Sequence, residues 1–149
     1  MSGGCQCGAV RYTLFAAPYQ AGICHCRMCQ KAFGSFFAPL AAVRHADVAW
    51  TRGRPAVFRS SAGAERGFCR DCGTPLSFEY VGGDHISLAI GSLDEPARVP
   101  PTHADGIESR LPWFDTLAGL PGRRTEEDFT PEEMERLRSR QHPDGPPPS

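Results

Sequence analysis

Cysteine is the residue whose number and spacing carry the clearest chemistry in this chain. The seven cysteines fall into three tight groups, at positions 5–7, 24–29 and 69–72. Zinc takes four ligands in a tetrahedron and binds thiolates well, and each group is compact enough to offer its sulfurs to one ion. The spacing therefore predicts metal binding rather than isolated buried thiols.

Disulfide bonds are the main alternative use of clustered cysteines. The first residues lack the basic and apolar regions of a secretory signal peptide, and no stretch is long and apolar enough to cross a membrane. We therefore expect a cytoplasmic protein without a membrane partner. Thiols stay reduced in that compartment, and an odd number of cysteines, seven, prevents complete pairing.

The first and last cysteine groups are suited to form one closed site. Each is a pair of cysteines followed by glycine: Cys5, Cys7 and Gly8, and then Cys69, Cys72 and Gly73. The glycine lets the backbone turn away while both sulfurs converge on one ion. Together the two pairs would tie the N-terminal segment to the middle of the chain. Spacing alone also allows the first pair to join the central group.

The central group consists of Cys24, Cys26 and Cys29, which lie within six residues. Three protein ligands leave the fourth position of a zinc ion free for water or a substrate, as in catalytic zinc sites. A second structural site completed by a distant histidine is an alternative, and His103 is the candidate for that ligand or for a proton carrier. An iron–sulfur site is a further alternative, although CxCxxC is not the usual spacing of such sites.

Residues of other types near the central group have two interpretations each. His25 stands between two cysteines and is expected to point away from the metal, either as an exposed turn residue or as an acid–base group beside the site. Five aromatic residues are candidates for the wall of a pocket near the metal, or for the core: Phe33, Phe36, Phe37, Trp113 and Phe114.

The elements that must position these residues are predicted to be short β-strands. Apolar residues alternate in short runs between glycines and prolines, at 8–17, 35–43, 48–51, 56–59, 65–68, 76–81 and 85–90. Pro39 indicates an edge strand or a bulge for the run in which it lies. The pair Gly82-Gly83 predicts a hairpin between the last two runs.

The chain changes character after Gly91, where a proline-rich connector begins. Thr130 followed by Pro131 and Glu133 has the pattern of an N-cap, a first-turn proline and a capping box, which predicts a short helix to about position 140. The remaining residues, 141–149, are rich in proline and are predicted to be disordered.

Composition and charge exclude several classes of function. A chain of 149 residues that is 40% apolar suits one domain with a single modest core. A net charge of -1 and scattered arginines argue against a nucleic-acid partner, including the zinc-ribbon type. The H-x-E and P-C-x-x-C signatures of zinc deaminases are absent. Small molecules or neutral protein surfaces are the expected partners, and the sequence does not indicate an oligomeric state.

Six motifs follow one another over roughly residues 3–120: GCQCGAVRY at 4–12, CHCRMCQK at 24–31, GSF at 34–36, FCRDCGTPL at 68–76, LPWF at 111–114 and GLP at 119–121. In this order they resemble the glutathione-dependent formaldehyde-activating enzyme family, which also includes centromere protein V. The resemblance implies a zinc-binding domain at 1–121 and leaves 122–149 as a charged, proline-rich tail.

The resemblance implies an Mss4-like fold that is mainly β, with packed antiparallel sheets stabilised by zinc, to which the tail adds its short helix. It also implies two zinc ions per chain. The structural zinc would be held by Cys5, Cys7, Cys69 and Cys72, and the catalytic zinc by Cys24, Cys26 and Cys29.

The activity implied by the resemblance is that of a carbon–sulfur lyase. The partners would be a small thiol, such as glutathione, and an aldehyde, such as formaldehyde, which form or release an S-hydroxymethyl adduct. Three thiolates reduce the charge felt at a zinc ion, so thiol and carbonyl chemistry suits the site better than activation of water. A zinc-stabilised binding module without catalysis is the alternative function.

Overall fold

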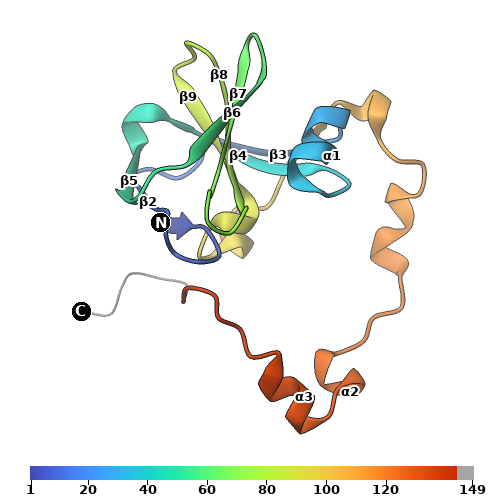
Figure 1. Ribbon diagram of the computed structural model, residues 1–149. Coiled ribbons are helices and arrows are strands. Elements are labelled where there is room, and N and C mark those ends of the chain that lie inside the picture. Colours follow the sequence, from blue (N-terminus) through green and yellow to red (C-terminus); the bar gives the residue numbers. More distant parts are fainter. Residues whose placement is uncertain (144–149) are drawn as a thin grey trace.

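The structure is a computed structural model that describes residues 1–143, and two β-sheets form its body (Figure 1). The smaller sheet contains three antiparallel strands in the order β1 (Ser2–Gly4), β2 (Arg11–Leu14) and β5 (Val48–Arg52). It carries the first cysteine pair in the turn between β1 and β2.

The larger sheet contains seven strands in the order β10 (His103–Asp105), β3 (Gln20–Cys24), β4 (Ala38–Arg44), β9 (His85–Ala89), β8 (Pro75–Tyr80), β7 (Ala64–Phe68) and β6 (Ala56–Ser61). Its pairings are antiparallel except for β10, which lies parallel to β3 and places Asp105 opposite Cys24. This edge strand brings a late segment of the chain beside the central cysteines.

Helices are short and few in the described part of the chain. They are α1 (Arg27–Phe33), α2 (Thr125–Asp128) and α3 (Pro131–Arg136), with 3₁₀ turns at His45–Asp47, Ile90–Ser92, Pro96–Arg98, Ile107–Ser109 and Phe114–Gly119. None of the helices within residues 1–143 has the length and apolar character needed to span a bilayer.

The hydrophobic core lies between the two sheets and takes residues from both. Tyr12 of the smaller sheet and Val43, Leu76 and Leu88 of the larger one are almost fully buried in it. The Tyr12 hydroxyl lies 2.8 Å from Ser92 Oγ, so its polar end is paired inside the core. The alternation of apolar residues along these strands is what turns one face of each sheet inward.

The predicted fold class is confirmed, because the chain is mainly β with two packed sheets. The predicted runs from 48 to 90 correspond to β5 through β9, and β8 and β9 form the hairpin predicted around Gly82 and Gly83. The sequence analysis did not predict β1, β3, β10 or α1 as elements.

The prediction that Pro39 marks an edge strand or a bulge was wrong. Strand β4 is internal, with β3 on one side and β9 on the other. The pairing with β9 begins only at Leu40, whereas Pro39 pairs with Ile23 of β3. Proline is tolerated because it lies at the end of the strand, where only one neighbour is present.

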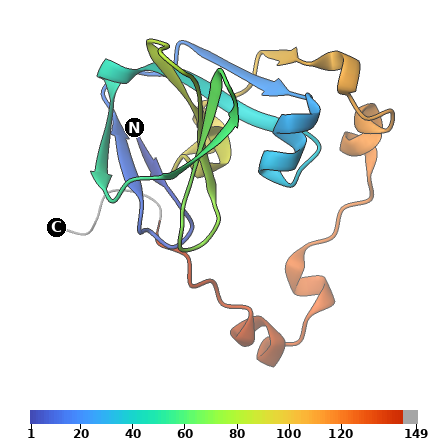
Figure 2. The same cartoon turned by 45° about the horizontal axis from the view of Figure 1, so that its top comes forward.

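The segment after β10 leaves the sheets, passes through α2 and α3, and returns to the vicinity of β1 (Figures 1 and 2). The backbone N–H of His142 donates a hydrogen bond to Gln6 O at 2.8 Å. The predicted capping box of Thr130 and Glu133 is confirmed, although α3 ends at Arg136. Disorder was predicted for residues 141–149, of which 144–149 lie outside the described residues. The domain boundary at 121 stays a prediction.

Candidate metal centres and the adjoining cavity

The sulfur atoms of two distant cysteine pairs meet at one place in the fold. They belong to Cys5, Cys7, Cys69 and Cys72, hereafter the four-cysteine cluster, and all lie within 4.8 Å of one another. The Sγ atom of Cys7 is 3.6 Å from that of Cys5 and 3.8 Å from that of Cys69. Zinc–thiolate bonds of about 2.3 Å in a tetrahedron separate neighbouring sulfurs by about 3.8 Å, so the cluster fits zinc.

Two similar turns bring these pairs together. The glycines that follow the pairs, Gly8 and Gly73, both have a φ of 76°, in the left-handed region that other residues avoid. The backbone N–H of Cys5 donates to Val10 O, and that of Cys69 donates to Thr74 O. Each turn therefore closes on its own backbone and presents its two sulfurs toward the opposite turn.

The thiols of the four-cysteine cluster differ in acidity. For Cys7, a backbone N–H from Ala9 acts to lower the pKa, but burial and the neighbouring thiols raise it to about 12. For Cys72, burial acts to raise the pKa, but hydrogen bonds from Thr74 and Cys7 outweigh it and lower the pKa to about 6. The cluster therefore ionises at Cys72 well before Cys7.

The other three sulfurs, those of Cys24, Cys26 and Cys29, also lie within 4.8 Å of one another and are called the three-cysteine cluster below. Cys24 ends β3, Cys26 is the N-cap of α1, and Cys29 lies in the first turn of that helix. The Sγ atom of Cys26 accepts the backbone N–H of Cys29 at 3.4 Å. The strand end and the helix start together fix the three side chains around one point.

A glycine allows the neighbouring loop to close over this cluster. Gly106, directly after β10, has a φ of 60°, and a Cβ atom there would lie 2.7 Å from the backbone nitrogen of Cys26. The side chain of Gln30, which is 4% exposed, donates to His25 O and to Ser109 O. The loop after β10 is thus held against the cysteines by close packing and by an amide hydrogen bond.

The three-cysteine cluster has no fourth protein ligand within residues 1–143, since no further cysteine, histidine or acidic side chain joins the group. His103 was the predicted candidate for that ligand. Its Nε2 atom instead lies 3.3 Å from Asp105 Oδ2 and 3.2 Å from Gln20 Nε2. The donor set fits a zinc ion that keeps one position for an exogenous ligand.

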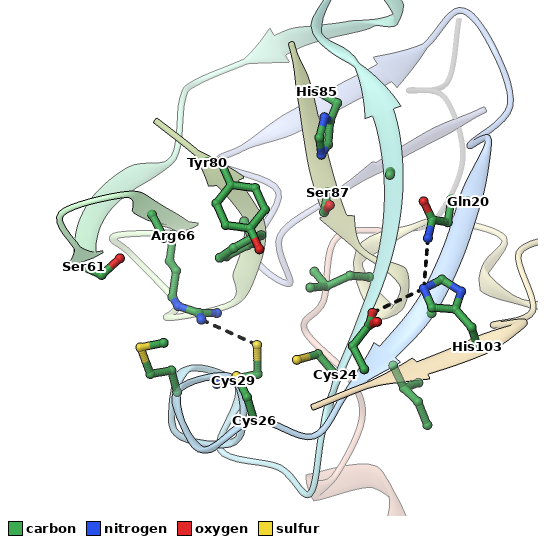
Figure 3. Close-up of a pocket in the computed structure, with 18 residues that line it drawn as sticks. Gln20, Cys24, Cys26, Cys29, Ser61, Arg66, Tyr80, His85, Ser87 and His103 are labelled. Carbon is green, nitrogen blue, oxygen red and sulfur yellow. Dashed lines mark hydrogen bonds and ion pairs between the residues drawn. The ribbon is translucent and has the colours of Figure 1, made fainter. Parts of the chain in front are cut away.

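A cavity of about 470 Å³ opens directly onto the three-cysteine cluster. Figure 3 shows the three cysteines at one end, Arg66 beside Cys29, and His103 next to Gln20 on a wall further along. Its volume suits a small organic ligand. A molecule in this cavity would therefore have direct access to the sulfur atoms of the cluster.

Arg66 is the site residue that the sequence analysis missed. It lies on β7, is only 7% exposed, and its Nη2 atom donates to Cys29 Sγ at 3.5 Å. The sequence signal that could have identified it was its place in the predicted strand 65–68, where it faces the opposite side from Glu65. In the structure, Arg66 lines the cavity together with Ala64. An arginine on the inward face of a strand is unusual enough to mark a site.

Burial and neighbouring groups set the acidity of the three-cysteine cluster. Burial raises the pKa of Cys24 to about 12. Burial also raises the pKa of Cys29, against the opposing hydrogen bond from Arg66. For Cys26, burial acts to raise the pKa, but hydrogen bonds from Cys29 and Cys24 outweigh it and lower the pKa.

His25 is fully buried, so the interpretation as an exposed turn residue was wrong. Its ring packs edge-on against Phe114, with centroids 4.6 Å apart, and lies 6.1 Å from the Phe37 ring. Neither ring nitrogen has a hydrogen-bond partner among the described residues, and His25 does not line the cavity. An acid–base role for His25 stays a prediction, and its contacts are those of a packing residue.

The five aromatic candidates do not line this cavity. Phe36 packs on Trp113, and Phe37 packs on Phe114, with ring centroids 4.9 and 5.6 Å apart. The aromatic residues of the cavity wall are instead Phe78 and Tyr80 of β8. This wall could not be inferred from the sequence, because the position of β8 relative to the cysteines depends on the order of strands in the larger sheet.

The fold and the two clusters define a mainly β protein with two cysteine sites of metal-binding geometry. Comparison with known proteins gives the family: the chain belongs to the glutathione-dependent formaldehyde-activating enzyme family, whose model matches residues 1–107. The matched region includes all seven cysteines and Arg66.

Two individual proteins are also similar to this chain. One is an uncharacterized lyase of Schizosaccharomyces pombe, 31% identical over 81 residues, an alignment that covers 54% of this chain and 58% of the relative. The other is a protein from Rhodobacter sphaeroides with a crystal structure, 24% identical, with a TM-score of 0.56 over 70% of this chain and 99% of that one. The latter supports the fold alone.

Proposed function

We propose that this chain is a zinc-dependent enzyme of the carbon–sulfur lyase type, which forms or cleaves the adduct of a small thiol with an aldehyde such as formaldehyde. The observation that carries the proposal is the three-cysteine cluster, which faces a cavity and has no fourth ligand among the described residues. The family match and the lyase-named relative support it, with a glutathione-like thiol as the first candidate substrate.

The reaction needs no oxidant or reductant. In the forward direction, the thiol S–H bond and the carbonyl π bond are replaced by a C–S bond and an O–H bond, and the reverse reaction restores them. Zinc held by three thiolates supplies a Lewis-acid position that can bind a sulfur or polarise a carbonyl oxygen. The cysteines of the cluster would hold this ion, and the cavity would orient the thiol carbon chain.

A proton must move from the thiol sulfur to the hydroxymethyl oxygen as the adduct forms. His103 is the cavity residue that we assign to this step, since its Nε2 atom lies 3.3 Å from Asp105 Oδ2. A carboxylate beside an imidazole holds the ring in one orientation. The imidazole would take the proton from the thiol and return it to the oxygen.

The test is the rate at which S-hydroxymethyl adduct forms and exchanges. The zinc-loaded protein is mixed with formaldehyde and a panel of thiols that includes glutathione, and exchange is followed by NMR against the uncatalysed rate. We expect acceleration that saturates with thiol and that is lost in Cys26→Ser. No acceleration with any pair would overturn the proposal and favour a non-catalytic binding module.

A further inference from the structure

Arg66 makes several contacts although its side chain is almost fully buried. Its Nε atom donates to Ser60 Oγ at 3.2 Å, and its guanidinium carbon lies 5.0 Å from the centroid of the Phe78 ring. Its Nη2 atom donates to Cys29 Sγ at 3.5 Å, and its Nη1 atom is buried without a hydrogen-bond partner among residues 1–143. The side chain is therefore held in place, and its Nη1 group is the donor that lacks a partner in the described part of the chain.

The charge of Arg66 needs a counter-charge. A guanidinium stays protonated in proteins, and burying a charge without an opposite charge nearby is costly. In the part of the chain that the structure describes, no carboxylate forms an ion pair with Arg66. Among its contacts, the group that can carry a negative charge is the Cys29 sulfur, which accepts the hydrogen bond from Nη2.

The contact between Arg66 and Cys29 changes the net charge at the open coordination position of the three-cysteine site. A divalent zinc ion with three thiolates carries a net charge of -1, which repels a fourth anionic ligand. A guanidinium in contact with one of the sulfurs makes the assembly neutral. Neutralisation removes most of the electrostatic penalty for adding a thiolate, and matters much less for adding water or an intact thiol.

We propose that Arg66 is the fixed counter-charge of the three-cysteine site and makes its open position accept the substrate sulfur as a thiolate. The inference rests on the proposed function and specifies the form in which the thiol binds. On binding, the S–H bond breaks heterolytically, the electron pair stays on sulfur, and the proton passes to the His103 imidazole of the cavity wall. Arg66 acts through the cysteines, so it is a positioning residue.

The test uses three variants of the full chain. Arg66→Gln removes the charge, Arg66→Lys keeps a charge, and Arg59→Gln removes a charge from the neighbouring strand at an exposed position without a contact to cysteine. Zinc retention is measured with a chromogenic chelator, and the four-cysteine cluster serves as an internal control. Thiol binding is measured with 2-mercaptoethanol, which carries no carboxylate, through the sulfur-to-metal absorption of the cobalt(II)-loaded protein.

We expect Arg66→Gln to retain the zinc ion of the four-cysteine cluster normally and to bind the zinc ion of the three-cysteine cluster at least about 10-fold more weakly. Its affinity for the thiol should fall by about 10- to 100-fold. Arg66→Lys should recover most of both properties, and Arg59→Gln should match the unchanged protein. Equal zinc retention and equal thiol binding in Arg66→Gln would overturn the inference.

The two readouts separate this inference from the proposed function. If the unchanged protein binds no thiol, the proposed function fails and the thiolate part of the inference fails with it. A charge-dependent loss of zinc from the three-cysteine cluster would then still support Arg66 as its counter-charge. If the thiol binds equally to all variants, the proposed function stands and the role of Arg66 in thiolate binding is overturned.

Discussion

Cys7 Sγ lies 3.8 Å from Cys69 Sγ, although 62 positions separate the two residues in the chain. The contact joins the turn after β1 to the turn between β7 and β8, and so joins the two sheets at one end. A metal ion shared by these turns would close a long loop of the chain. Its binding free energy would then contribute directly to folding.

Replacing Cys69 with Ser is therefore expected to unfold the domain, since an open zinc site cannot hold both turns. Cys26→Ser is the matched control: it should lose one of two zinc ions and keep the folded sheets, because α1 and β3 are held by other contacts. Circular dichroism and zinc content per chain measure both effects. A single zinc in the unchanged protein would contradict the two-site interpretation, and unfolding of both variants would make the second site structural.

Metal binding at the three-cysteine cluster should weaken as the pH falls. The raised pKa of Cys24, about 12, means that this thiol is protonated in the metal-free fold at neutral pH. A ligand must be a thiolate, so metal binding displaces this proton, and the apparent affinity falls by about tenfold per pH unit for each proton displaced. Chelator competition between pH 8 and pH 6 measures the slope. A pH-independent affinity would show that the cluster is already ionised.

The buried ion pair between Arg11 and Asp94 should contribute to stability. Its two hydrogen bonds are 2.9 and 2.6 Å long, and its side chains are only 10% and 5% exposed. Asp94→Asn removes the carboxylate that pairs with the buried guanidinium and should cost about 3 kcal/mol of unfolding free energy. Urea denaturation of the zinc-loaded protein measures the loss.

The matched control for that pair is Glu95→Gln. It also converts a carboxylate to an amide, but it breaks the exposed ion pair with Arg98, in which both side chains are 60% exposed. The cost there should stay below about 1 kcal/mol. Equal losses for the two variants would mean that burial of the Arg11 pair adds nothing.

Gly106→Ala should damage the three-cysteine cluster alone. The left-handed backbone at this position and the 2.7 Å approach of an added Cβ to the backbone of Cys26 would force the loop away from α1. We expect the variant to lose one zinc and to keep the other. Gly91→Ala is the control, since no atom lies within 4 Å of an added Cβ there. Two zinc ions in both variants would refute this account of the loop.

The cysteine groups could be predicted from the sequence because ligand chemistry is local. A CxxC or CxCxxC run places its sulfurs near one another in almost any turn, and the positive φ of Gly8 and Gly73 follows from the same short motifs. The strand runs from 48 to 90 were predictable for a similar reason, since alternation of apolar residues is a property of neighbouring positions.

The rest of the site depends on contacts between distant parts of the chain. Strand β10 has only three residues, His103–Asp105, without apolar alternation, and it is defined by its pairing with β3. The contact of Arg66 with Cys29 spans 37 positions and depends on the order of strands in the larger sheet. Periodicity within a segment carries no information about either.

The lining of the cavity has two parts of different origin, one of which is the parallel edge strand β10. The sulfur ligands come from the β3–α1 junction, whereas His103 and Asp105 come from a short segment that reaches the cavity across one edge pairing. Changing the side chains at positions 103 and 105 would reshape this wall without replacing any of the sulfur ligands. The fold thus has a modular layout, in which one metal scaffold can be combined with different wall segments to select different ligands.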